Sequence, residues 1–336
     1  MNIREPYDGI FLIEIPIPTP LRSVNCYLAR GRDGWTIVDT GFHTEETELA
    51  WHTAFRELGV RPAEVKQIVV THHHGDHYGA AGWLQQQTGA VVLILDRELP
   101  RARRIWEDDY PPRVSAFMLS HGMPADIANT LAEEYERARR RALPHAQLTP
   151  VREGERITIG DRAFEVIWAP GHSDGLMVLW NVEERLLIAD DMILGEISPN
   201  ISLWPGGAPD PLAHYLASLD KVSRLPARLT LTGHREPVHD LARRSRELRE
   251  HHAHRLAETR RFTGARATGW EVACRLFQHA LNSVSNMRFA LTETVAHLEH
   301  LCGRGELVRR QSRDGTILYE PAAVAPAGGE RRCAAD

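Results

Sequence analysis

The 336-residue sequence has few cysteines and no long apolar run. Its four cysteines, Cys26, Cys274, Cys302 and Cys333, lie far apart and form no C-x-x-C pair. This spacing argues against a disulfide framework and against a thiolate zinc site. No apolar stretch approaches the roughly 18 to 20 residues that span a bilayer, and Met1–Glu5 lacks the basic start of a signal peptide. We therefore expect a cytoplasmic protein that does not enter a membrane.

The composition also lacks an excess of positive charge. The formal net charge is -5, so no overall attraction to nucleic acid is expected. The chain is 43% hydrophobic and 25% charged, which is typical of a globular protein long enough for one large domain and a small one.

What the sequence does contain is a dense histidine cluster, Thr71-His72-His73-His74-Gly75-Asp76-His77, directly after the apolar run at 67–70. A β-branched run that ends in a polar, glycine-containing stretch predicts a buried strand with these side chains in the loop at its end. Imidazole and carboxylate groups suit zinc, iron or manganese, and so dense a cluster is costly to desolvate without a cation. The alternative is a solvated or metal-scavenging His-rich tract, but a disordered tract should not follow a buried strand.

The spacing within this cluster separates the histidines by role. His72 and His74 are two residues apart, so an extended loop points both the same way and they can bind one metal ion. Asp76 and His77 follow at a turn and can face a second ion. The pattern H-x-H-x-D-H resembles the signature of the metallo-β-lactamase-fold hydrolases. His73 falls in the variable position of that pattern, and we do not count it as a ligand.

The resemblance implies further ligands at the ends of later strands. The predicted strand at 164–169 leads into Pro-Gly-His-Ser-Asp-Gly at 170–175, which is similar to the family's second motif. His172 of this motif is expected to complete the site begun by His72 and His74.

Two more strand ends match the family. The strand at 228–232 precedes His234, which is expected to join Asp76 and His77 on the second metal ion. Where the family shows Gly-Asp after a short apolar strand, this chain has Asp190-Asp191. We assign the bridging role to Asp191, because Asp190 then occupies the glycine position, and Asp190 remains the alternative.

The resemblance implies an α+β fold, a four-layer αββα metallo-β-lactamase sandwich. Asp39, in an Asp-Thr-Gly turn after an early strand, is expected to orient a ligand histidine through its other ring nitrogen. The alternative for Asp39 is an ordinary turn aspartate.

We expect the catalytic domain to cover residues 1–240, with a helical insertion at 96–146 that forms a lid over the metal site. Alternatively, the insertion is a scaffold of helices whose aromatic and methionine residues are core. The lid residues that we consider for substrate binding are Arg101, Arg104, Trp106 and Tyr110.

Residues 241–320 read as a helical linker and further helices, followed by two short strands around an Arg-Asp-Gly turn. This order resembles the winged-helix domain found in one branch of the family. The helix expected at 291–302 carries no lysine or arginine, so we expect a packing, pocket-closing or homodimer-forming role and no nucleic acid partner. His251, His252 and His254 are interpreted as a solvated helix face. Residues 321–336, rich in Ala, Pro and Gly, are expected to form a disordered tail.

The resemblance also implies the chemistry. Two divalent metal ions, preferably zinc, with iron or manganese as alternatives, would lower the pKa of a bridging water from about 15.7 towards 7. Asp76 is then both metal ligand and proton acceptor. The branch points to a glyoxalase II-like hydrolase of thioesters, of acyl-CoA or glutathione type, and the lid arginines suit an anionic small-molecule substrate. Alternatives are a phosphodiesterase or ribonuclease, a lactonase, and a regulatory protein that keeps the metal site as a relic.

Overall fold

Two β-sheets packed face to face form the body of the protein. The computed structural model describes residues 3–18 and 21–323. The first sheet has seven strands in chain order, antiparallel at its start and parallel from the fourth strand on. Its strands are β1 (Ile3–Tyr7), β2 (Ile10–Pro16), β3 (Ser23–Gly31), β4 (Gly34–Val38), β5 (Val65–Val70), β6 (Val91–Leu95) and β7 (Leu148–Val151).

The second sheet has five strands in the order β12-β11-β10-β9-β8, and its β11 and β12 pair in parallel. The carboxyl ends of β11 and β12 therefore meet at one edge. The strands are β8 (Arg156–Ile159), β9 (Arg162–Trp168), β10 (Met177–Asn181), β11 (Leu186–Asp190) and β12 (Leu229–Thr232).

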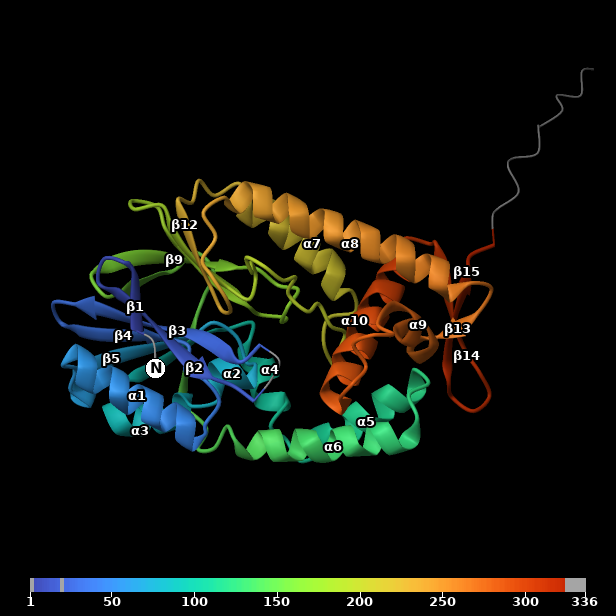
Figure 1. The fold of residues 1–336 in the computed structure, drawn as a ribbon, viewed down its shortest axis with the longest axis horizontal. Helices are drawn as coiled ribbons and strands as arrows, with labels where there is room; N and C mark the ends of the chain where they lie inside the picture. The colour runs from blue at the N-terminus through green and yellow to red at the C-terminus, as the bar shows by residue number, and fades with distance from the viewer. Residues whose placement is uncertain (1–2, 19–20, 324–336) are drawn as a thin grey trace, which may run out of the picture.

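Successive side chains of a strand point to opposite faces of its sheet, so each sheet packs on the other sheet with one face and on helices with the other. In β5, Val69 packs between the two sheets, whereas Ile68 and Val70 face the helices outside. Helices cover both outer faces, so the αββα sandwich predicted from the sequence is confirmed (Figure 1). The first sheet is covered by α1 (Glu45–Leu58) and α3 (Ala81–Thr88), and the second by α7 (Pro211–Val222) and α8 (Leu241–Thr263).

The insertion after β6 is helical, as expected. It packs against the C-terminal helices through a separate apolar cluster in which Val114, Met118 and Leu131 meet Leu291 and Val295. Tyr110, Met118 and Met123 are buried in this cluster, as the scaffold alternative stated. The insertion consists of α4 (Leu99–Arg104), α5 (Tyr110–Ser120) and α6 (Ala125–Arg140), and two short helices, η1 (Pro62–Glu64) and α2 (Gly75–Tyr78), precede it.

The C-terminal part continues from α8 into two more helices and a small sheet with strand order β13-β15-β14. A capping box of Thr268 and Glu271 begins the helix Gly269–Leu276, and Ser283 caps the helix Val284–Gly303. The elements are β13 (Ala267–Thr268), α9 (Gly269–Leu276), α10 (Val284–Gly303), β14 (Leu307–Gln311) and β15 (Ile317–Pro321).

Some expectations for this region need correction. Helix α10 begins at Val284, earlier than the expected start at Leu291, because Ser283 supplies the N-cap. His252 is buried rather than solvated: its Nδ1 lies 3.2 Å from Nε2 of His297, and the two rings stack. The expected tail overlaps the end of β15 at Pro321, and from residue 324 on it lies outside the described residues.

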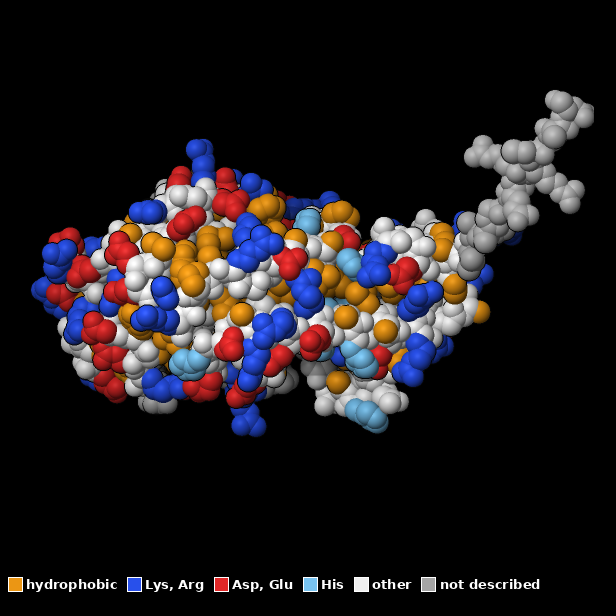
Figure 2. All heavy atoms as spheres, turned by 90° about the horizontal axis from the view of Figure 1, so that it is seen from above, with side chains coloured by type: hydrophobic (Ala, Val, Ile, Leu, Met, Phe, Trp, Pro, Cys, Tyr) orange, Lys and Arg blue, Asp and Glu red, His pale blue; other side chains and the backbone are white. Residues whose placement is uncertain are grey.

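The surface seen in Figure 2 carries basic and acidic side chains interspersed, as on an ordinary solvated face. In the part of the chain that the structure describes, no helix combines the length and the apolar character needed to cross a bilayer.

Candidate metal centre

Five loops at strand ends converge at one edge of the sandwich. They follow β4, β5, β9, β11 and β12 and carry Asp39, the histidine cluster, His172, Asp191 and His234. Because β4 and β5 are parallel, as are β11 and β12, their carboxyl ends lie at the same edge. This topology brings together residues that are up to 195 positions apart, from Asp39 to His234.

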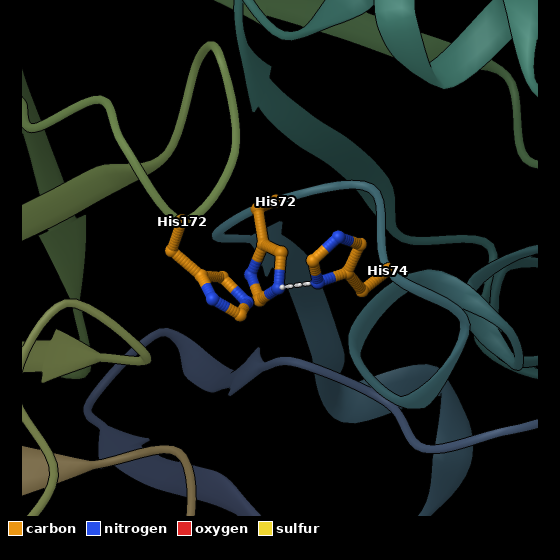
Figure 3. Close-up of side chains that lie close together, drawn as sticks. All are labelled: His72, His74 and His172. Carbon is orange, nitrogen blue, oxygen red and sulfur yellow. Dashed lines mark hydrogen bonds between the residues drawn. The ribbon is translucent and has the colours of Figure 1, made fainter. Parts of the chain in front are cut away.

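The first group of possible ligands comprises His72, His74 and His172, whose ligand atoms all lie within 4.8 Å of one another (Figure 3). Nε2 of His72 is 3.0 Å from Nδ1 of His74. Burial, together with neighbouring histidines, lowers the pKa of both His72 and His74 well below the usual range. Both imidazoles are therefore neutral, which is the form that binds a metal ion.

The second group comprises Asp76, His77 and His234. Nε2 of His234 lies 3.6 Å from a carboxylate oxygen of Asp76. Burial acts to lower the pKa of both histidines, but nearby carboxylates outweigh it and raise the pKa of His77 well above its usual range and that of His234 to about 9. The carboxylates thus create a strongly negative site that favours a cation.

Asp191 lies between the two groups. Its Oδ2 is 3.3 Å from Nε2 of His172, 3.5 Å from Nε2 of His77 and 3.6 Å from Nε2 of His234. Burial acts to raise the pKa of Asp191, but His234 and His77 lower it well below the usual range. Asp191 is therefore a carboxylate that can reach ions held by either group.

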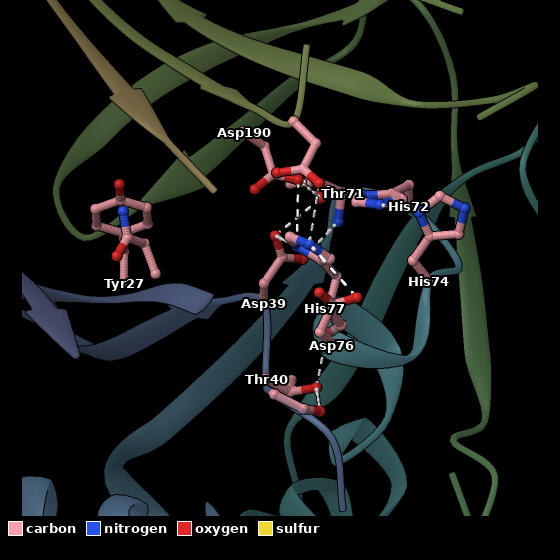
Figure 4. Close-up of polar contacts among 12 residues, drawn as sticks. Tyr27, Asp39, Thr40, Thr71, His72, His74, Asp76, His77 and Asp190 are labelled. Carbon is pink, nitrogen blue, oxygen red and sulfur yellow. Dashed lines mark hydrogen bonds and ion pairs between the residues drawn. The ribbon is translucent and has the colours of Figure 1, made fainter. Parts of the chain in front are cut away.

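Asp190 has a different place. Its Oδ2 is in hydrogen-bond contact with Oγ1 of Thr71 and lies 3.2 Å from Nδ1 of His72 and 3.4 Å from Nδ1 of His77 (Figure 4). The residue has φ 50°, a left-handed conformation that favours glycine. A backbone conformation that suits glycine is thus adopted here by an aspartate, which contacts ligand rings. The sequence interpretation placed Asp190 in the glycine position of the motif and kept it as the alternative bridging ligand.

Asp39 orients the same loop. Its carboxylate accepts hydrogen bonds from the backbone N–H and Oγ1 of Thr71, each at 2.8 Å, and lies 3.1 Å from Nδ1 of His77 (Figure 4). Burial and the neighbouring Asp190 raise the pKa of Asp39 to about 7. Asp39, His77 and Asp190 are also close enough to hold an ion, but the two carboxylates already bind Thr71.

The remaining ligand rings are held by backbone carbonyl groups. His172 donates from Nδ1 to the backbone oxygen of Asn200 at 3.0 Å, and His234 donates from Nδ1 to that of Ser23 at 2.8 Å. Each ring therefore presents Nε2 towards Asp191. Among the described residues, Nε2 of His77, Nε2 of His172 and Oδ1 of Asp191 are buried without a hydrogen-bond partner. Converging donor atoms without partners fit a bound metal ion.

His73 is turned to another partner. It hydrogen-bonds through Nδ1 to the buried carboxylate of Glu98, whose second oxygen accepts from the backbone N–H of Gly175 at 2.6 Å. Glu98 thus ties the first histidine loop to the loop of His172. Sequence reasoning missed Glu98, which lies before α4 and has no motif around it.

A narrow pocket adjoins the first group, and His74, His172, Arg101, Ser202 and Trp204 are among its lining residues. Of the lid residues considered from the sequence, Arg101 alone lines it. The other three have structural contacts: Tyr110 accepts a hydrogen bond from Arg101, Arg104 pairs with Asp109, and Trp106 stacks on Tyr78. Ser202 and Trp204, which also line the pocket, were missed because their loop carries no motif.

Comparison with known proteins agrees with this geometry. The family described as Metallo-beta-lactamase superfamily matches residues 19–234, and the family described as Metallo-beta-lactamase-like, C-terminal domain matches residues 256–322.

Two solved structures cover almost the whole chain. A metallo-beta-lactamase family protein from Thermus thermophilus is 34% identical, covers 94% of this chain and 99% of its own, and has a TM-score of 0.85. A beta-lactamase domain protein from Burkholderia ambifaria is 30% identical, covers 96% of this chain and 94% of its own, and has a TM-score of 0.84. The curated relative "Probable metallo-hydrolase YqjP" from Bacillus subtilis is 25% identical over 300 residues, 88% of this chain and 92% of its own.

Proposed function

The chain belongs to the metallo-beta-lactamase superfamily and carries the His/Asp clusters of a metallo-hydrolase, and we propose that it hydrolyses a thioester with the help of two divalent metal ions. The position of Asp191 supports the part of this proposal that calls for two metal ions. Its Oδ2 lies within 3.6 Å of Nε2 atoms from both ligand groups.

Each group would hold one ion. His72, His74 and His172 would bind the first, and Asp76, His77 and His234 the second, with Asp191 between them. A set rich in imidazole suits zinc, while iron and manganese accept the same ligands. When bound, two such ions supply Lewis acidity and lower the pKa of water enough for attack at neutral pH.

The protein's own residues prepare this chemistry. Asp39 and Asp190 contact Nδ1 atoms of ligand rings, so that Nε2 of His72 and His77 faces the site. Asp76, whose side chain is 18% exposed, is more accessible than Asp191, whose side chain is 7% exposed. We assign to it the acceptance of a proton from the attacking water, as well as metal binding.

The side chains that line the pocket beside the first group are our argument for a small organic substrate over a polymer. Its wall combines the Trp204 ring and the Arg101 guanidinium with the hydroxyl groups of Ser173 and Ser202. Such a wall can hold the apolar and the anionic parts of a thioester, as in acyl-CoA or glutathione derivatives.

The C-terminal domain supports the same choice. Its order of helix, strand, two helices and hairpin fits a winged helix. The helix that would enter a DNA groove is α10, but its residues 290–292 and 294–298 are buried against the insertion and α8. We therefore propose that this domain closes the pocket and does not bind nucleic acid.

The test is a substrate panel on purified protein whose metal content is measured by mass spectrometry. The panel holds acyl-CoA thioesters of several lengths, S-lactoylglutathione, homoserine lactones, bis-p-nitrophenyl phosphate and a single-stranded RNA. Thioester cleavage that disappears in the Asp76→Asn variant supports the proposal. Cleavage of RNA, phosphodiester or lactone while the thioesters stay uncleaved contradicts the proposal. A fully metal-loaded protein that cleaves no thioester also contradicts it.

A further inference from the structure

Helix α10 brings an arginine without an ion-pair partner close to the pocket. Arg288 is partly buried, and its guanidinium lies 5.6 Å from the ring centroid of Trp204 and 4.3 Å from that of Phe289. Within the described ranges, its side chain has neither an ion pair nor a hydrogen bond, and its Nε atom is enclosed without a partner. A guanidinium always carries its charge, so leaving the enclosed Nε donor unpaired is costly.

Arg288 belongs to a cluster that reaches the pocket, which we call the arginine–aromatic cluster: Arg101, Tyr110, Tyr135, Trp204 and Arg288. The ring of Tyr135 lies 5.5 Å from that of Tyr110 and 6.3 Å from that of Trp204. Arg101 lies over the Tyr110 ring at 5.4 Å, and both Arg101 and Trp204 line the pocket beside His74 and His172. The cluster therefore continues from the metal ligands to α10.

Carboxylates pair with several other arginines of the insertion but, among the described residues, not with those of the cluster. Arg104 and Arg113 both bind Asp109, and Arg139 binds Asp108. Arg101 donates only to neutral acceptors, at 2.7 Å to the backbone oxygen of Pro205 and at 2.9 Å to the Tyr110 hydroxyl. Among the described residues, no carboxylate lies at hydrogen-bond distance from Arg101 or Arg288, so the charge of both cations is left unpaired.

The acidic groups near Arg288 and Arg101 do not pair with these two arginines. Burial lowers the pKa of Arg288, and Tyr135, Glu134 and Asp76 oppose the change, yet none of the three accepts a hydrogen bond from it. Asp174, a carboxylate in the pocket wall, accepts instead from the backbone N–H of Ala208 at 3.1 Å.

We propose that Arg288, together with Arg101, forms a subsite for an oxyanion of the substrate, a carboxylate or a phosphate, at the edge of the pocket where Trp204 meets the arginine–aromatic cluster. The aromatic rings stabilise the cations while the subsite is free and exclude water when it is filled. The part of this inference that makes the ligand a substrate rests on the proposed hydrolytic function. The subsite also gives the C-terminal domain, which contributes Arg288, a direct role in substrate selection.

Equilibrium binding tests the subsite without relying on turnover. Isothermal calorimetry would compare three alkyl thioethers of equal length that end in a carboxylate, a phosphate or an uncharged carboxamide. Wild-type protein is expected to bind the two acidic probes roughly 10- to 100-fold more tightly than the carboxamide, the range of charge-assisted hydrogen bonds. The tighter of the two identifies the oxyanion.

The Arg288→Met variant should lose the preference for the acidic probes and keep the affinity for the carboxamide probe. The Arg288→Lys variant should keep part of the preference for the acidic probes. Arg304→Met is the matched control, because Arg304 ends the same helix and pairs with Glu306 at 2.8 Å. Equal binding of all three probes by the wild type overturns the subsite, and so does a preference that survives in Arg288→Met. If Arg288→Met does not fold, Arg288→Gln replaces it. Probe discrimination without thioester cleavage would refute the proposed function but keep the subsite.

Discussion

Asn200 connects the metal centre to helix α10 through a hydrogen bond of 2.8 Å from its Nδ2 to Oε2 of Glu293. The backbone oxygen of the same Asn200 holds Nδ1 of His172. Two further contacts join this loop to α10: Ser202 Oγ lies 2.8 Å from Thr292 Oγ1, and Leu203 N–H donates to the Thr292 backbone oxygen at 3.1 Å. The C-terminal domain therefore supports the orientation of a metal-binding ring.

Glu293 should make stability depend on pH. Burial raises its pKa to about 7, against the opposing effects of Arg255 and Asn200. The unfolded chain ionises near the ordinary value of 4.5, so between about pH 4.5 and 7 the folded protein binds more protons and its stability falls as pH rises. The loss is on the order of 3 kcal/mol. Denaturant unfolding of Glu293→Gln should lack this slope, and parallel curves for variant and wild type would contradict the prediction.

Asp191 and Asp190 should differ in their effect on metal content. Asp191→Asn removes the carboxylate that lies between the two ligand groups, so we expect fewer metal ions per chain and a loss of turnover. Asp190→Asn alters only contacts to Nδ1 atoms and to Thr71, and should lower affinity by about 10- to 100-fold while full loading at high metal remains. Elemental analysis at limiting and saturating metal separates the two. The reverse order of effects would make Asp190 the bridging residue.

Asp39→Asn should weaken metal binding without changing the fold. An amide has one acceptor oxygen for the three donors that Asp39 now serves on Thr71 and His77. The expected loss is about 10- to 100-fold in affinity, measured by competition with a chelator. Asp161→Asn is the control, since Asp161 serves Arg32 far from the site. An unchanged affinity in Asp39→Asn would show that Asp39 is an ordinary turn residue.

Gly171 should not accept a side chain. It has φ 138°, and a Cβ there would lie 2.4 Å from Tyr215 Cβ and 2.7 Å from Tyr215 N. Gly154, with φ 84° and nothing within 4 Å of an added Cβ, controls for backbone strain alone. Gly171→Ala should cost about 1 to 3 kcal/mol more than Gly154→Ala in chemical unfolding. Equal costs would mean that the loop before His172 can shift away from Tyr215.

Local patterns were enough to predict part of the site. The two-residue spacing of His72 and His74 and their place after an apolar strand follow from backbone periodicity, which short sequence windows record. The αββα fold, by contrast, was predicted through resemblance to a family. Burial of His252 was missed because the charged residues around it on α8 dominate the local pattern, whereas its partner His297 comes from another helix.

The sequence by itself determined that the histidine cluster at 71–77 stands at the end of a buried strand, because strand periodicity and turn residues act over a few positions. The later ligands His172, Asp191 and His234 were predicted through the family resemblance. The tertiary structure alone decided that Asp191 lies between the groups while Asp190 turns to Thr71, and that Asn200 and Glu293 connect His172 to the C-terminal domain. These relations depend on how the parallel strand ends and α10 meet in space. Distances between atoms more than 90 residues apart are set by packing of the whole chain, which no local pattern encodes.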